Sequence, residues 1–150
     1  MPKEIEHKFL VNVSKLPRPL PRGVKMVQGY LSSNPTVRVR LISGKKSVAY
    51  LTIKGAGLRE RDEFEYEIPV AHARTLLKMC GARTLSKVRR RLGGWELDQF
   101  TRRHKGMWLA EFELSSRRSK LPKLPEWVGV EVTGDGRYSN SALASQPDKR

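Results

Sequence analysis

Short stretches in which apolar and polar residues alternate run along most of the chain. Successive side chains of an extended strand point to opposite faces, so each stretch predicts a β-strand with one apolar face. Gly and Pro residues, which favour turns, separate the stretches. We expect strands at residues 3–11, 26–32, 36–42, 47–54, 62–68, 84–92, 94–100, 107–115 and 128–133.

Two segments have helical spacing instead. Residues 69–80 repeat apolar side chains every three or four positions, with Pro69 near the start and Gly81 just after the end. Residues 138–145 show a shorter version of the same pattern. We therefore expect a mainly β (α+β) protein, with antiparallel strands and a few helices, in one domain covering residues 1–150.

Length and cysteine usage add two expectations. The sequence has 150 residues and a single cysteine, Cys80, which excludes an intramolecular disulfide and fits a reducing compartment. No apolar run approaches the ~20 residues that a membrane-spanning helix needs. We expect a cytoplasmic protein without a membrane partner.

The charge is the compositional outlier. Thirty Lys and Arg residues against 15 Asp and Glu residues give a formal net charge of +15 at pH 7. Such a charge points to anionic partners, among them nucleic acid, polyphosphate, nucleotides and acidic membrane surfaces. The net charge alone does not choose among these partners.

The charged residues are arranged strand by strand. In Glu4-Ile5-Glu6-His7-Lys8, alternation places Glu4, Glu6 and Lys8 on one face. One such run is typical of a solvated strand, but the pattern recurs in six further strands. The acids on these faces are Glu4, Glu6, Glu63, Glu65, Glu67, Glu96, Asp98, Glu111 and Glu113, and the basic residues are Lys8, Arg38, Arg40, Lys54, Lys87 and Arg89.

Neighbouring strands of a single charge sign are costly without a ligand, which indicates a shared binding site. About eight strands closed into a barrel would gather these faces around an interior that holds a small ligand. The 15 residues just named give that interior a formal charge of −3, which two divalent cations would change to +1. A polyphosphate is therefore expected to enter together with its metal ions.

A series of short motifs, taken in order, resembles the CYTH superfamily, the triphosphate tunnel metalloenzymes, and in particular its short bacterial members. The resemblance covers nearly the whole chain. It implies a closed eight-stranded antiparallel β-barrel tunnel with a few flanking helices, which binds a triphosphate and Mg²⁺ or Mn²⁺. The motifs are Glu4-Ile5-Glu6-His7-Lys8, Gln28-Gly29-Tyr30-Leu31, Arg38-Val39-Arg40, Leu51-Thr52-Ile53-Lys54-Gly55, Glu65-Tyr66-Glu67-Ile68, Lys87-Val88-Arg89, Ala110-Glu111-Phe112-Glu113-Leu114, and Glu131-Val132-Thr133 through Arg137-Tyr138 with Asn140.

Carried over residue by residue, the resemblance implies two groups of ligands. The metal would be held by Glu4, Glu6, Glu111 and Glu113. Phosphate oxygens would be bound by Lys8, Arg38, Arg40, Lys54, Lys87, Arg89 and Arg137. Further acids of the tunnel would be Glu63, Glu65, Glu67, Glu96 and Asp98. These roles agree with phosphoryl transfer, which needs in-line positioning and neutralisation of the phosphate oxygens.

The group that activates water is less well specified. In some short members of the superfamily a tyrosine–lysine pair serves, which implies Tyr30 and Lys54 here. Like charges on Arg38 and Arg40 would lower the pKa of Lys54 and so favour proton transfer. The alternatives are acids beside a metal-bound water, namely Glu65, Glu67 and Asp98.

The predicted function is hydrolysis of a phosphoanhydride bond of inorganic triphosphate (tripolyphosphate) by a metal-dependent enzyme. Thiamine triphosphatase, nucleoside triphosphatase and class IV adenylate cyclase are the alternatives within the superfamily. A noncatalytic polyphosphate- or RNA-binding protein is the alternative outside it, and the nine acids of the charged faces count against an RNA surface. The oligomeric state is open, with a homodimer among the alternatives.

Overall fold

The computed structural model describes residues 3–56, 60–115 and 119–145, without the side chains of Lys3, Glu4 and Glu60. All nine predicted strands are present, with ends that differ by two residues or fewer. They are β1 (Lys3–Val11), β2 (Val24–Ser33), β3 (Thr36–Ser43), β4 (Val48–Lys54), β5 (Glu60–Ile68), β6 (Thr84–Leu92), β7 (Trp95–Thr101), β8 (Trp108–Leu114) and β9 (Val128–Glu131). The helices are α1 (Val70–Met79) and α2 (Asn140–Ala144), with 3-10 turns η1 (Val13–Lys15), η2 (Arg102–His104) and η3 (Gly136–Tyr138).

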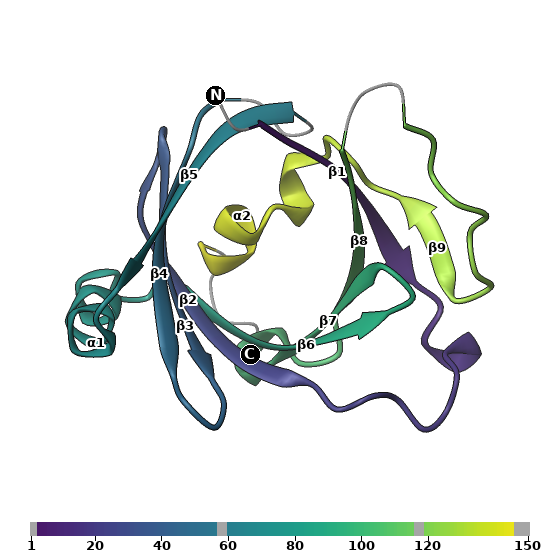
Figure 1. Ribbon diagram of the computed structural model, residues 1–150, viewed down its shortest axis with the longest axis horizontal. Coiled ribbons are helices and arrows are strands. Elements are labelled where there is room, and N and C mark those ends of the chain that lie inside the picture. The colour runs from purple at the N-terminus through teal and green to yellow at the C-terminus, as the bar shows by residue number, and fades with distance from the viewer. Residues whose placement is uncertain (1–2, 57–59, 116–118, 146–150) are drawn as a thin grey trace.

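The strands form one antiparallel sheet in the order β5-β4-β3-β2-β6-β7-β8-β1-β9. β1 also pairs with β5, where Lys3 lies opposite Asp62 and Ile5 opposite Glu60. Figure 1 shows the strands curling around α2, with β9 outside β1 and α1 outside β3 and β4. The predicted class, mainly β with antiparallel pairing, is confirmed.

The registers carry one charged face from strand to strand. Arg38 on β3 lies opposite Tyr30 on β2 and Thr52 on β4, and Thr52 lies opposite Glu65 on β5. Because alternate residues of a strand share a face, these pairings place the charged positions on the same side of the sheet. The apolar positions between them face the other side.

Helix α1 covers part of this apolar side. Ala73 of α1 is fully buried in a cluster with Val39 and Leu41 of β3 and Ala49 of β4. Gly81, which follows the helix, has φ +61, a conformation that favours glycine and ends the helix. The helix predicted at residues 69–80 is therefore confirmed.

A second apolar cluster lies between β1, β7 and β8 and the segment that leads into β9. The ring of Trp95 contacts Phe9, Phe112 and Trp127 edge-to-face, with centroid distances of 5.4, 5.0 and 5.7 Å. Such contacts stabilise aromatic pairs beyond the area that they bury. This cluster helps to hold β9 along the edge of β1 with which it pairs.

Helix α2 differs in position from the prediction of flanking helices. Its Leu143 is fully buried against Leu85, Phe100 and Leu109, which belong to the charged side of β6, β7 and β8. Ser139 has extended backbone between η3 and α2 and caps α2 by accepting a hydrogen bond from Ala142 N at 3.1 Å. The segment thus turns into the interior that the strands surround (Figure 1). Among the described residues, no helix has the length and apolar character required to cross a membrane.

Candidate functional site

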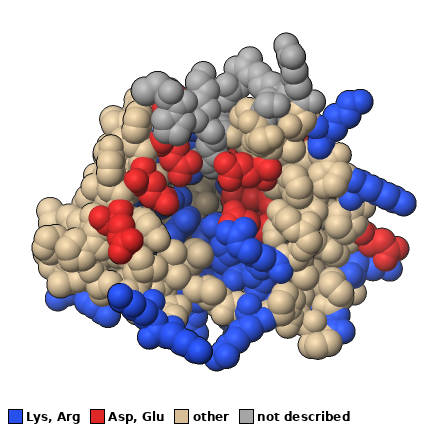
Figure 2. Space-filling view, in the orientation of Figure 1, with Lys and Arg blue, Asp and Glu red and all other residues tan. Residues whose placement is uncertain are grey.

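A cavity of about 1090 Å³ lies on the charged side of the sheet. Figure 2 shows acidic and cationic side chains gathered around this hollow. The sequence-predicted residues that line it are Glu6, Lys8, Tyr30, Arg38, Arg40, Lys54, Glu63, Glu65, Arg89, Glu96, Glu111 and Glu113. The structure therefore brings together residues of eight strands, β1 to β8, that are far apart in the sequence.

Four predicted site residues lie elsewhere. Lys87 and Asp98 are buried in the protein beside the cavity rather than on its surface. Glu67 continues the charged face of β5 but is exposed, because it lies at the far end of the strand. Arg137 is also exposed, and its guanidinium is 2.7 Å from Asp135 of the same turn. Glu4 lies on β1, but its side chain is outside the described residues.

Arg137 was expected to bind phosphate in the cavity, and its position differs most from that expectation. Two of its side-chain nitrogens donate to Asp135, and these hydrogen bonds raise the pKa of Arg137. The structure does not bring its guanidinium to the cavity. The phosphate-binding role carried over for Arg137 therefore finds no geometric support, because a three-residue turn directs the side chain to its own neighbour.

The charge of the cavity is opposite in sign to the expected −3. Nine cationic and six acidic residues line it among those described, a formal charge of +3. Four of the cations were missed by sequence reasoning, namely Arg22, Arg61, Arg83 and Arg91. Arg61 and Arg91 could have been found by alternation, since they continue the faces of Glu63 and Arg89. Arg22 and Arg83 precede strands and have no such signal.

Four of the six acids form one wall on β1, β8 and β7. Glu6 on β1 lies opposite Glu113 on β8, and Glu111 on β8 lies opposite Glu96 on β7. All four line the cavity. Like charges directly opposite each other destabilise a sheet unless a cation lies near them. Arg61 Nη2, 3.9 Å from Glu6 Oε1, supplies part of that positive charge.

Carboxylate oxygens are the ligands that Mg²⁺ and Mn²⁺ prefer. Within the described residues, no group of three or more His, Cys, Asp or Glu side chains is placed to hold a metal ion. Mg²⁺ commonly binds through one or two carboxylates together with water and substrate phosphates. The acidic wall fits that kind of site, with Glu6, Glu111 and Glu113 as the described candidates and β1 also carrying Glu4.

Two arginines of β3 lie on another wall. Arg38 Nη2 donates to Thr52 Oγ1 at 3.2 Å, while its buried Nε has no hydrogen-bond partner among the described residues. Arg40 Nε donates to Gln28 Oε1 at 3.0 Å. Burial and the charges of Arg38 and Arg89 lower the pKa of Arg40 to about 10, so it remains cationic at neutral pH. A buried N–H donor without an acceptor is costly, and an anion in the cavity would satisfy it.

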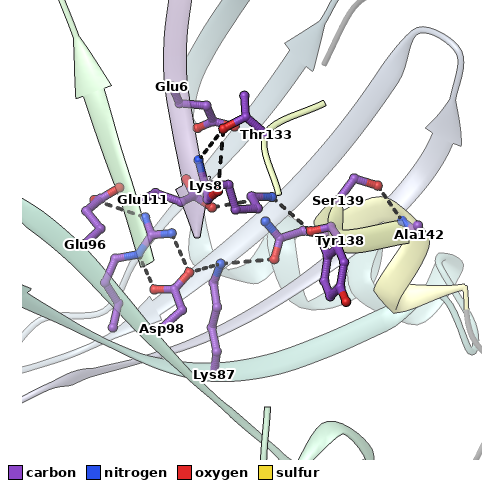
Figure 3. Close-up of polar contacts among 12 residues, drawn as sticks. Glu6, Lys8, Lys87, Glu96, Asp98, Glu111, Thr133, Tyr138, Ser139 and Ala142 are labelled. Atoms are coloured by element: carbon purple, nitrogen blue, oxygen red, sulfur yellow. Dashed lines mark hydrogen bonds and ion pairs between the residues drawn. The ribbon is translucent and has the colours of Figure 1, made fainter. Parts of the chain in front are cut away.

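A buried ion cluster lies beside these residues (Figure 3). Arg89 binds both oxygens of Asp98, with Nε–Oδ1 at 2.7 Å and Nη2–Oδ2 at 2.9 Å. Lys87 Nζ is 2.7 Å from Asp98 Oδ2 and donates to Asn140 Oδ1 at 3.3 Å. Burial would raise the pKa of Asp98, but Lys87 and Arg89 outweigh it and hold the pKa well below its usual range.

The same cluster contains a lysine with an unusual pKa. Burial outweighs the attraction of Asp98 and lowers the pKa of Lys87 from 10.5 to about 7. Loss of this proton would leave Asp98 still bound by Arg89. The pKa of Lys87 is thus lower than that of an exposed lysine, and strongly shifted pKa values occur most often at functional sites.

Lys8 joins the acidic wall to the C-terminal segment. Its Nζ is 3.6 Å from Glu111 Oε1 and donates to the carbonyl of Tyr138 at 3.0 Å (Figure 3). Burial would raise the pKa of Glu111, but Lys8 and Arg89 lower it to about 2. The carboxylate of Glu111 is therefore ionised at any pH near neutrality and can attract a cation.

The predicted catalytic pair lies on β2 and β4. Tyr30 is buried, lines the cavity and accepts a hydrogen bond from Gln28 Nε2 at 2.8 Å. Lys54 is also buried and lines the cavity, opposite Glu63 on β5. Both residues thus face the same space, with β3 between their strands.

No family model matches the chain. Two curated relatives do match over nearly their full length, and both are inorganic triphosphatases. One, from Acetivibrio thermocellus, is 40% identical and covers 99% of this chain and 97% of the relative. The other, from Nitrosomonas europaea, is 34% identical and covers 94% and 96%. The chain belongs to the inorganic triphosphatase family.

Solved structures agree with membership of the inorganic triphosphatase family. A crystal structure of an inorganic triphosphatase aligns with a TM-score of 0.66 and 29% identity, over 99% of both chains. A structure of a protein from Pyrococcus horikoshii aligns with a TM-score of 0.55 and 21% identity over 77% of this chain, which shows a shared fold alone. The resemblance to the triphosphate tunnel metalloenzymes is confirmed at the level of the family.

Proposed function

We propose that this chain hydrolyses a phosphoanhydride bond of inorganic triphosphate with the help of a divalent metal ion. The observation that carries the proposal is the cavity itself, which nine cationic side chains line together with a wall of paired carboxylates. The cations match a polyanionic substrate and the carboxylates match its metal. The names and identities of the curated relatives support the same activity.

The proposed architecture is a closed eight-stranded tunnel over a single domain, residues 1–150. The pairing of β1 with β5 supports closure. The strands from β5 to β1 are the first eight in the sheet order, so this pairing joins the first of them to the last. The continuous charged face around these strands supports a tunnel with one interior. Closure matters for function because it surrounds the substrate with charges and limits its contact with water.

Within the tunnel, arginines and lysines would bind the phosphate oxygens. Arg38 and Arg40 can form the paired hydrogen bonds that guanidinium groups make with phosphate, while Arg89, whose guanidinium binds Asp98 and Glu96, would contribute positive charge. The buried Nε of Arg38 supports an anionic ligand at this position. Lys8 and Lys54 would add positive charge as the negative charge of the reacting phosphate redistributes.

Glu6, Glu111 and Glu113, with Glu4, are proposed to hold Mg²⁺ or Mn²⁺. When bound, such an ion would neutralise phosphate oxygens and orient them for in-line attack. The ionised state of Glu111, which its low pKa secures, suits this role. Glu63, Glu65 and Glu96 would limit the net positive charge of the cavity and so help the product to leave.

Lys54 is proposed to accept the proton of the attacking water, with Tyr30 as the second member of the pair. Both side chains line the cavity, which a group that acts directly on water must do. Lys87 is the alternative, favoured by its pKa of about 7. In the structure, however, its ammonium is held by Asp98 and Asn140, away from the cavity surface.

Measurement of phosphate release tests the proposal and its alternatives. The purified chain is assayed with tripolyphosphate, ATP and thiamine triphosphate, each with Mg²⁺ and with Mn²⁺. We expect kcat/KM for tripolyphosphate to exceed the other two by at least tenfold. A higher value for thiamine triphosphate or ATP would assign those activities instead, and cyclic AMP formation would indicate a cyclase. Metal-independent RNA binding without turnover would favour the noncatalytic alternative.

A further inference from the structure

Gln28 connects two residues that line the cavity without lining it itself. It lies on β2, two positions before Tyr30 and directly opposite Arg40 of β3, and its side chain is fully buried. Arg40 Nε donates to Gln28 Oε1 at 3.0 Å, and Gln28 Nε2 donates to Tyr30 Oη at 2.8 Å. One amide therefore bridges a cation and a phenol that both face the proposed substrate.

Chemistry fixes the direction of both hydrogen bonds. A guanidinium has no acceptor atom, so the amide must turn its oxygen toward Arg40. The amide nitrogen then faces Tyr30, whose hydroxyl oxygen must accept. The single proton of that hydroxyl points away from Gln28 and is available to the cavity that Tyr30 lines.

The same bridge orients Arg40. Its Nε is engaged by Gln28, which leaves the two terminal nitrogens of the guanidinium for a ligand. These nitrogens form the edge that binds two phosphate oxygens at once. Because the Gln28 side chain is wholly buried among packed strands, it can hold this orientation without a large loss of side-chain freedom on substrate binding.

We propose that Gln28 is a positioning residue for triphosphate hydrolysis, which fixes Arg40 for phosphate binding and turns the Tyr30 hydroxyl proton toward the substrate. This inference rests on the proposed function. It predicts two separable effects, one on substrate affinity through Arg40 and one on turnover through Tyr30. A residue that served only to fill the interior would not affect substrate affinity through Arg40 or turnover through Tyr30.

Three variants test the proposal. Gln28→Leu removes both hydrogen bonds. Gln28→Glu keeps the size and the Arg40 contact, but its carboxylate accepts from Tyr30 and so turns the hydroxyl proton away from the cavity. Gln99→Leu is the matched control, because Gln99 accepts from Arg90 Nη1 at 2.9 Å across β6 and β7, on the face away from the cavity.

We expect Gln28→Leu to raise KM for tripolyphosphate about tenfold and to lower kcat about tenfold, in line with the loss of two buried hydrogen bonds. Gln28→Glu should lower kcat at least as much. Gln99→Leu should stay within about twofold of the wild type in both constants. Wild-type kinetics in Gln28→Glu would overturn the proposal.

A double variant separates positioning from packing. In a Tyr30→Phe background, Gln28→Leu should change kcat less than about threefold, because the hydroxyl is already absent, while KM still rises about tenfold. Losses in kcat that multiply would contradict action through Tyr30. Thermal unfolding of each variant verifies that the proteins compared are folded.

The proposed function and the role of Gln28 can fail separately. A wild type without metal-dependent phosphate release would overturn the proposed function. Calorimetric titration with tripolyphosphate and Mg²⁺ then decides the role of Gln28 by itself. Binding by Gln28→Leu at least tenfold weaker than by the wild type supports that role, and equal binding refutes it.

Discussion

Glu6 on β1 lies directly opposite Glu113 on β8, and both carboxylates line the cavity. Opposed carboxylates repel each other, so placing this pair inside one site is costly unless positive charge lies near them. Changing Glu113 to Gln should therefore lower metal-dependent phosphate release by on the order of 100-fold, while leaving the metal-free protein folded. Kinetics and thermal unfolding without metal measure the two effects.

The matched control for that substitution is Glu67→Gln. Glu67 has the same strand parity as Glu63 and Glu65 but is exposed outside the cavity. It should retain wild-type activity and metal dependence. A Glu113→Gln protein that keeps full activity, or that unfolds while Glu67→Gln does not, would show that Glu113 is structural.

Asp98 forms ion pairs with two buried cations, Lys87 and Arg89, so its replacement should lower the free energy of unfolding. Replacing it by Asn leaves both cations without their carboxylate, which costs about 3–5 kcal/mol of unfolding free energy for a buried pair. Urea denaturation measures this value. Asp135→Asn breaks an ion pair of the same 2.7 Å length at the surface and should produce no measurable change. Similar small effects for both would contradict the inferred importance of burial.

Glu111 gives the fold a defined acid sensitivity. Lys8 and Arg89 overcome burial and lower the pKa of Glu111 from 4.5 to about 2. Since the folded-state pKa is the lower one, the ionised carboxyl stabilises the fold above pH 4.5, and this contribution is lost as the pH falls from 4.5 toward 2. Unfolding free energies measured across that window should fall less steeply for Glu111→Gln than for the wild type. Identical slopes would refute the assignment.

Lys54 is the proposed base, and its removal should act on turnover. Lys54→Met should lower kcat by roughly 10²–10⁴-fold, the usual contribution of a positioned acid–base group. Lys46→Met, at an exposed turn, is the control and should match the wild type. If Lys87→Met instead abolishes turnover while Lys54→Met keeps most of kcat, the base is Lys87.

Much of this site could be predicted from the sequence because strand parity is a local property. Glu6, Lys8, Arg38 and Arg40 face the cavity as alternation indicated. The same alternation places Arg61 on the cavity face of β5, together with Glu63 and Glu65. Alternation places side chains reliably wherever a strand is long and its neighbours pair in register.

Other features depend on tertiary structure and have no local signal. Glu67 obeys the parity of β5 yet lies beyond the cavity, since parity gives the face but not the depth. Arg137 lies in a short turn, where its direction is set by Asp135 rather than by a strand. Lys87 and Asp98 are on the predicted face, but both are buried, with Asn140 of α2 against Lys87 and Arg89 of β6 against Asp98. Their burial, and hence the pKa of Lys87, could not be read from the sequence.

The central claim is that a metal ion and a triphosphate react together in this cavity. Phosphate release from tripolyphosphate by the purified wild type, measured with Mg²⁺ or Mn²⁺, with EDTA, and after metal is restored, tests it most directly. The account predicts rapid release with metal, a fall to the uncatalysed rate in EDTA and full recovery on restoring the metal. Release that is unchanged by EDTA, or no release under any of these conditions, would contradict it.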